Sequence, residues 1–229
     1  MKKTVRNIAV FLGFLSFMAC QQKPQESAAV ATTSTGELDR TVLPIKEPKR
    51  PLYSELNVEN ATAPARFEVN APKGAPNVIV ILIDDMGFGT SEAFGGPIAM
   101  PTIDRLATDG LRYNRFHTTA LCAPTRTALL SGYNHHSNNM GVITEAATTF
   151  PGYTGVRPQT ITPMAEVLRQ NGYNTAQFGK CHEVPPWEIS NNGPQDRWPT
   201  RSGFEKFYGF LGGETNQWAP LFCSLKRDH

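Results

Sequence analysis

An apolar run at 78–83 is the feature that most constrains the fold. It reads VIVILI, six consecutive apolar residues that are mostly β-branched, and the aspartates Asp84 and Asp85 follow it directly. β-branched side chains favour strands, and a run that is apolar on both faces is typical of a strand covered by helices on both sides. The run therefore predicts an α/β fold with a mostly parallel central sheet.

Later segments supply the helices and a second strand of such a fold. Segment 101–110 begins with a proline and ends with a glycine, which is typical of a short helix. Segment 162–172 repeats this pattern, with Thr162 as the expected N-cap. Segment 173–180 then predicts a strand that ends at Lys180. This alternation of strands and helices favours a layered α/β sandwich.

The N-terminal third of the chain has a different character. Segment 1–20 carries basic residues before an apolar run that is too short to span a bilayer, and it ends at Cys20. This pattern resembles a bacterial lipoprotein signal whose cysteine is acylated; an exported protein with an unmodified thiol is the simpler alternative. We expect a signal peptide at 1–20, a flexible tether at 21–75 and an ordered domain at 76–229, in a bacterial protein that is periplasmic or anchored to the membrane by lipid.

Charge and cysteine content exclude a nucleic-acid-binding protein, a disulfide scaffold and a paired zinc site. The net charge of +2 comes from scattered residues, so no nucleic-acid partner is expected. The four cysteines are too widely spaced for a disulfide scaffold or a paired zinc site, so each has to be considered by itself.

The stretch LCAPTRTALLSG at 121–132 places Cys122 at the start of a predicted helix. Backbone amides at a helix N-terminus favour an anion, and Arg126 lies one turn further on the same face. Cys122 is therefore either a reactive group or a small buried thiol at a helix start. Asp84 and Asp85 follow the predicted strand, where they either hold a divalent cation or serve as a cap and a solvated charge.

Taken together, these motifs resemble the sulfatase family, of bacterial arylsulfatase type, within the alkaline-phosphatase-like superfamily. CAPTRTALLSG matches the family signature C-x-P-x-R, and NVIVILIDDMG is similar to the family's first metal-binding strand. GYNTAQFGKCH and the run from GFEKFYGF to NQWAP are also similar to arylsulfatase segments, so the resemblance covers about 76–222. It implies an alkaline-phosphatase-like layered sandwich, of which 76–229 is the N-terminal part of the catalytic domain.

The resemblance implies hydrolysis of sulfate esters at a modified cysteine. A formylglycine-generating enzyme would oxidise Cys122 to formylglycine, whose hydrate offers one hydroxyl that attacks sulfur and a second that lets sulfate leave. Asp84, Asp85 and the residue at 122 would bind Ca²⁺, with Mg²⁺ as the second choice.

The same resemblance implies roles for three further side chains. Arg126 would hold the hydrate, Lys180 would bind the sulfate group, and His182 would act as the base. The family has a bulky aromatic residue between the lysine and the histidine, where this chain has Cys181.

The resemblance also implies that the chain is incomplete. In the family, the later half supplies an Asp-Asn pair, a second lysine and a further histidine, and none of these has a match here. We therefore expect a truncated form with an incomplete sheet and little activity. Two alternatives remain open, namely a phosphonate or phosphodiester hydrolase of the same superfamily, and an exported pseudoenzyme or binding protein.

Overall fold

The computed structural model describes residues 38–49, 52, 54–63, 66–216 and 218–226. The expected signal peptide, including Cys20, and the first part of the expected tether lie outside the described residues. Among the described residues, no helix is long and apolar enough to cross a membrane.

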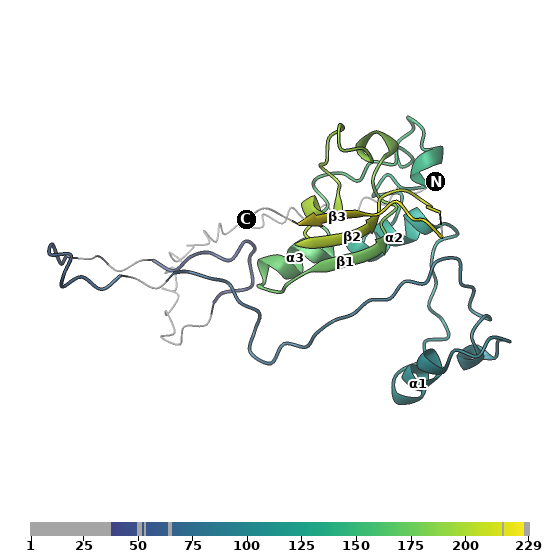
Figure 1. Cartoon of the computed structure of the whole chain (residues 1–229), viewed down its shortest axis with the longest axis horizontal. Coiled ribbons are helices and arrows are strands. Elements are labelled where there is room, and N and C mark those ends of the chain that lie inside the picture. Colours follow the sequence, from purple (N-terminus) through teal and green to yellow (C-terminus); the bar gives the residue numbers. More distant parts are fainter. Residues whose placement is uncertain (1–37, 50–51, 53, 64–65, 217, 227–229) are drawn as a thin grey trace, which may run out of the picture. The chain divides into compact units, whose positions relative to one another are not determined.

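The described residues contain three α-helices, namely α1 (Pro101–Asp109), α2 (Cys122–Ser131) and α3 (Met164–Gln170) (Figure 1). The 3₁₀ turns are η1 (Glu92–Phe94), η2 (Thr144–Ala146), η3 (Pro186–Glu188) and η4 (Pro199–Arg201). The strands are β1 (Ala176–Lys180), β2 (Lys206–Phe210) and β3 (Cys223–Lys226).

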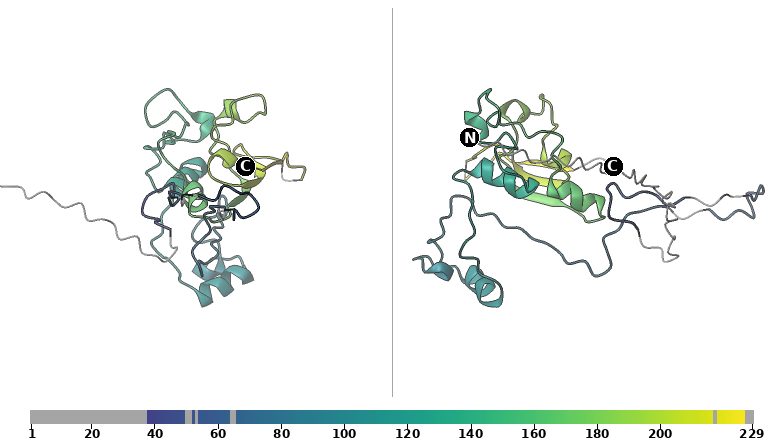
Figure 2. Two further views of the ribbon diagram at one scale, coloured as in Figure 1. Left: turned by 90° about the vertical axis from the view of Figure 1, so that its left-hand side faces the viewer. Right: turned by 180° about the vertical axis from the view of Figure 1, so that it is seen from behind.

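The three strands form one mixed sheet in the order β1-β2-β3. β1 pairs with β2 in parallel, with Lys180 opposite Phe210, and β3 pairs with β2 in antiparallel orientation. Helices α2 and α3 lie along one face of this sheet (Figures 1 and 2). The expected α/β class is confirmed, and the sheet within the described residues is small and mixed.

The helices begin and end largely where the local sequence predicts. α1 starts at Pro101, and α2 starts at Cys122. The predicted cap of α3 is wrong, because Pro163 occupies the N-cap position and no side chain caps the helix. Gly172 follows α3 with φ +85°, and a Cβ there would lie 2.3 Å from a backbone carbon of Asn70, so only glycine fits.

The predicted strand at 78–83 is wrong for this structure. The segment has no strand partner among the described residues, and its side chains are exposed, with Ile79 at 83% and Ile81 at 75% of their full accessible surface. A strand that is apolar on both faces becomes buried only where neighbouring strands and helices cover it. In the described part of the chain, those neighbours do not lie against this segment.

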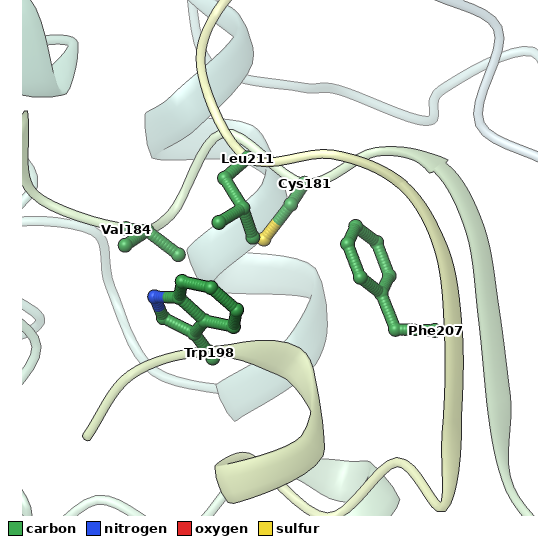
Figure 3. Packing of buried hydrophobic residues seen from close by; sticks show 5 residues of the cluster. All are labelled: Cys181, Val184, Trp198, Phe207 and Leu211. Atoms are coloured by element: carbon green, nitrogen blue, oxygen red, sulfur yellow. The ribbon is translucent and has the colours of Figure 1, made fainter. Parts of the chain in front are cut away.

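The hydrophobic core lies around the carboxyl end of β1. It contains Cys181, Val184, Trp198, Phe207 and Leu211, each at most 3% exposed (Figure 3). Cys181 is thus a core residue. Burial raises the pKa of its thiol to about 12, so the side chain packs as a neutral group. This core anchors the segment that directly follows β1.

Parts of the expected tether contact the end of α3. The Arg40 guanidinium donates a hydrogen bond of 2.8 Å to the Asn171 carbonyl, and the Ala71 amide donates one of 3.1 Å to the Gly172 carbonyl. The described residues of 38–75 contain no helix or strand. The boundaries at 20 and 75 remain predictions.

Candidate active site

Cys122 is the first residue of α2 and is half-buried. Its sulfur lies 3.1 Å from Nδ1 of His182, within hydrogen-bonding distance. The start of α2 is also tied to the preceding loop, since the hydroxyl groups of Thr119 and Thr125 are 2.7 Å apart. The helix start therefore presents the Cys122 side chain directly to an imidazole nitrogen.

His182 reaches this position because the chain stays beside β2 after β1 ends. The Cys181 amide donates to the Phe210 carbonyl at 2.9 Å, and the His182 amide donates to the Leu211 carbonyl at 3.1 Å. His182 is only 2% exposed and has φ +53°, a left-handed conformation that is uncommon outside glycine. Such backbone strain is frequent at functional sites. The second ring nitrogen, Nε2, lies 2.8 Å from Oε2 of Glu145.

Two cations of the site converge on one carboxylate. Nη2 of Arg126 lies 3.1 Å from Oδ1 of Asp84, and Nζ of Lys180 lies 2.7 Å from Oδ2. Arg126 also donates through Nη1 to the Lys180 carbonyl at 2.7 Å, which ties α2 to the end of β1. Partial burial raises the pKa of Asp84, but the hydrogen bonds from Lys180 and Arg126 outweigh that effect and hold it below its usual value. The side chains of Arg126 and Lys180 therefore form a site that binds an anionic group, which in this structure is the Asp84 carboxylate.

The expected metal ligands are not assembled in the described residues. Asp85 is exposed, has φ +52°, and makes no hydrogen bond or ion pair within the part of the chain that the structure describes. Both oxygens of Asp84 are engaged by cations. No group of three or more His, Cys, Asp or Glu side chains among the described residues could hold a metal ion. Since Ca²⁺ takes six to eight oxygen ligands, the described donors do not by themselves complete a Ca²⁺ site.

Sequence reasoning missed two acidic residues beside the site. Glu145 lies in η2 and reaches His182 from a segment without any recognisable motif. Glu183 follows His182 directly and is 8% exposed; burial raises the pKa of its carboxyl to about 7, although Arg157 and Arg126 oppose this rise. The only sequence signal for Glu183 is its position next to a candidate base.

The described residues thus combine an α/β sheet with a cysteine at a helix start and basic residues at a strand end. The profile of the Sulfatase family matches residues 76–228. The chain belongs to the sulfatase family, whose members generally use a formylglycine and a divalent cation.

Curated relatives are similar to part of the chain. An uncharacterized sulfatase of Schizosaccharomyces pombe is 35% identical over 161 residues, which cover 67% of this chain and 27% of the relative. An arylsulfatase of Klebsiella aerogenes is 34% identical over 148 residues, covering 64% and 30%, and human arylsulfatase D is 32% identical over 148 residues, covering 63% and 25%. The chain therefore spans 25–30% of the length of these relatives.

Solved structures give similar partial matches. The PsFucS1 sulfatase from Pseudoalteromonas sp. matches with a TM-score of 0.44 and 27% identity, covering 58% of this chain and 25% of that one. A structure described as Ps i-CgsB matches with a TM-score of 0.42 and 25% identity, covering 58% and 27%.

Proposed function

We propose that this chain carries the nucleophile of a sulfate ester hydrolase of arylsulfatase type, with Cys122 as the precursor of formylglycine. The observation that carries this proposal is the 3.1 Å approach of Cys122 to His182 at the N-terminus of α2. Membership of the sulfatase family supports the reaction class. A formylglycine-generating enzyme would be the partner in maturation, and a sulfate ester would be the substrate.

A hydrated aldehyde at position 122 supplies one hydroxyl that attacks sulfur and a second whose proton must be removed before sulfate can leave. His182 is placed to remove that proton, because its Nδ1 faces the side chain at 122. Because His182 is buried, bulk water does not compete for its ring nitrogens, and the surrounding residues hold the imidazole in place. His182 is therefore proposed as the base of the release step.

Arg126 and Lys180 are proposed to bind the sulfate group. Their side chains are only 10% and 11% exposed, and both already bind one carboxylate of this chain. Partly desolvated cations that are fixed in position bind a developing anionic charge more strongly than mobile surface cations do. Because Asp84 lies between them, the sulfate would compete with its carboxylate.

The described ligands by themselves do not complete the coordination of the family's divalent cation. Binding of Ca²⁺, or of Mg²⁺ as the second choice, through Asp84, Asp85 and residue 122 remains a prediction. Export with a lipid anchor at Cys20 is likewise a proposal that rests on the sequence pattern at 1–20.

Mass spectrometry of the tryptic peptide 116–126 tests the proposal directly. The full chain is produced together with a formylglycine-generating enzyme, with Cys122→Ala as the control. We expect the mass of an aldehyde at position 122 and turnover of an aryl sulfate in preference to the matching aryl phosphonate. An intact, alkylatable thiol in all molecules would instead favour an exported pseudoenzyme or binding protein. A preference for the phosphonate would favour the phosphonate hydrolase of the same superfamily.

A further inference from the structure

His182 lies between two side chains that come from distant segments. Its Nδ1 faces the Cys122 sulfur at 3.1 Å, and its Nε2 faces the Glu145 carboxylate at 2.8 Å. Among the described residues, Glu145 makes no hydrogen bond to the side chain at 122. We propose that Glu145 is a positioning residue, which fixes the ring proton of His182 on Nε2 and thereby presents a bare Nδ1 to the nucleophile at position 122. This inference rests on the proposed function.

The choice of ring nitrogen follows from the hydrogen-bonding capacity of each group. A neutral imidazole has one N–H donor and one acceptor, and an ionised carboxylate only accepts. The Nε2–H of His182 therefore donates to Glu145, which leaves Nδ1 free to accept a proton from residue 122. A histidine with the opposite tautomer would face the nucleophile with an N–H and could not act as its base.

Glu145 is itself held in place. Its Oε2 accepts a hydrogen bond of 3.0 Å from the Thr144 hydroxyl, and its Oε1 accepts one of 3.2 Å from the Gly213 amide. Partial burial raises the pKa of Glu145, whose side chain is 44% exposed, but the hydrogen bond from His182 and those from neighbouring groups outweigh this effect and keep the pKa below its usual value. The carboxyl group is thus ionised at neutral pH and acts as an acceptor.

A glycine at 213 is required for this contact. A Cβ at that position would lie 2.8 Å from Nε2 of His182 and 3.1 Å from Oε1 of Glu145. Any side chain there would enter the space in which the imidazole and the carboxylate meet. The backbone of 211–213 therefore supports His182 and Glu145 together, since Leu211 also accepts the His182 amide hydrogen bond.

The carboxylate has a second consequence when the imidazole takes up a proton. His182 then becomes a cation that donates to an anion, and such charge-assisted hydrogen bonds are stronger than neutral ones. Loss of one hydrogen bond to a charged group corresponds to a rate effect of roughly tenfold or more. A neutral acceptor at 145 would keep the tautomer but lose this stabilisation.

The test uses the full chain produced without a formylglycine-generating enzyme, so that Cys122 remains a thiol. With ¹⁵N-labelled histidine, NMR reports which ring nitrogen of neutral His182 carries the proton. The rate of Cys122 alkylation by iodoacetamide, read from peptide 116–126, reports how well His182 accepts its proton. Both readouts are independent of hydrolysis.

For the wild-type chain, we expect the Nε2–H tautomer. Glu145→Ala should remove this preference and slow alkylation of Cys122 roughly tenfold. Glu145→Gln, whose side-chain carbonyl still accepts an N–H, should keep the tautomer but slow alkylation. The exposed Glu92 lies outside the site, and Glu92→Ala is the matched control that should change neither readout.

An unchanged tautomer together with an unchanged alkylation rate in folded Glu145→Ala would overturn the inference. Circular dichroism of each variant checks that the fold is retained. If Cys122 is never converted to formylglycine in the presence of the maturation enzyme, the proposed function fails instead, and the tautomer and alkylation results still stand by themselves.

Discussion

Cys122 and His182 are 60 positions apart in the chain, yet the Cys122 sulfur lies 3.1 Å from Nδ1 of His182. One residue starts helix α2, and the other lies just beyond strand β1. The hydrogen bond from Arg126 to the Lys180 carbonyl joins the same two elements. A nucleophile and a base are thus held together by contacts between a helix start and a strand end.

Removal of either cation should abolish most sulfate ester hydrolysis by the matured chain. Arg126→Ala and Lys180→Ala are each expected to lower the rate with an aryl sulfate by a factor of about 100 or more, because each removes a fixed positive charge from the sulfate position. Lys206→Ala, on exposed strand residue Lys206, is the control and should retain the wild-type rate. Wild-type rates in both site variants would contradict the roles proposed for these cations.

Glu183 should make the chain less stable as the pH rises. Burial raises the pKa of this carboxyl from 4.5 in the unfolded chain to about 7 in the folded chain. Its contribution to stability is therefore fully present below pH 4.5 and is lost as the pH rises through 7. We expect urea denaturation to show a fall in the free energy of unfolding on the order of 3 kcal/mol between pH 5 and pH 8 from this group alone.

Glu183→Gln is the matched variant for that measurement, since it keeps the size of the side chain but cannot ionise. Its free energy of unfolding should depend less on pH than that of the wild type. The difference between the two plots of unfolding free energy against pH isolates Glu183 from other titrating groups. Parallel plots for the two proteins would show that the folded chain does not raise the pKa of this carboxyl.

Gly213→Ala should separate His182 from Glu145 without removing either side chain. The added Cβ would lie 2.8 Å from Nε2 of His182, so the ring or the carboxylate must move. We expect slower alkylation of Cys122 in the unmodified chain. Gly212→Ala is a close control, because a Cβ there would meet only Ile189 at 4.0 Å. Equal alkylation rates in the two variants would argue against the proposed contact.

Calcium binding by the chain should be weak. The described ligands are Asp84, which is already paired with two cations, and the exposed Asp85. A cation that needs six or more oxygens would be coordinated mostly by water, so we expect a dissociation constant of about 1 mM or weaker in isothermal titration calorimetry. Lys180→Ala should tighten binding by freeing Oδ2 of Asp84. A wild-type chain that binds Ca²⁺ at micromolar concentration would contradict this expectation.

Cys20 should anchor the protein to membranes if the segment 1–20 is a lipoprotein signal. The mature wild-type protein is expected to enter the detergent phase in phase partition, because acyl chains bury many methylene groups in a bilayer. Cys20→Ser should release it to the aqueous phase. Mass spectrometry of the mature N-terminus provides the second readout. Equal partition of both forms would rule out acylation of Cys20 as the cause.

Local sequence patterns predicted the elements whose signals lie within a few residues. The proline at 101 and the stretch 121–132 indicated the starts of α1 and α2, and β1 ends at Lys180 as expected. The cap of α3 was predicted wrongly because a proline at 163 was placed one position too far into the helix. Helix starts and strand ends are local features, since they depend on a few backbone conformations and hydrogen bonds.

The exposure of the run at 78–83 could not be predicted from local sequence patterns. Its composition favours a buried strand, but burial depends on neighbours that the segment itself does not contain, and the described structure leaves it exposed. The pairing of Asp84 with Arg126 and Lys180 could not be predicted for the same reason. The burial of 78–83 and the pairing of Asp84 both depend on which distant segments of the chain pack against them.

The sequence by itself determined the family, the helix-initial Cys122 and the basic residues Lys180 and His182 near a strand end, because these features are short motifs with fixed spacing. Only the tertiary structure decided that Glu145 faces His182 and that Glu183 is buried beside Arg126. Contacts between segments far apart in the chain depend on packing and on the close approach of the backbone at Gly213, which no local pattern specifies.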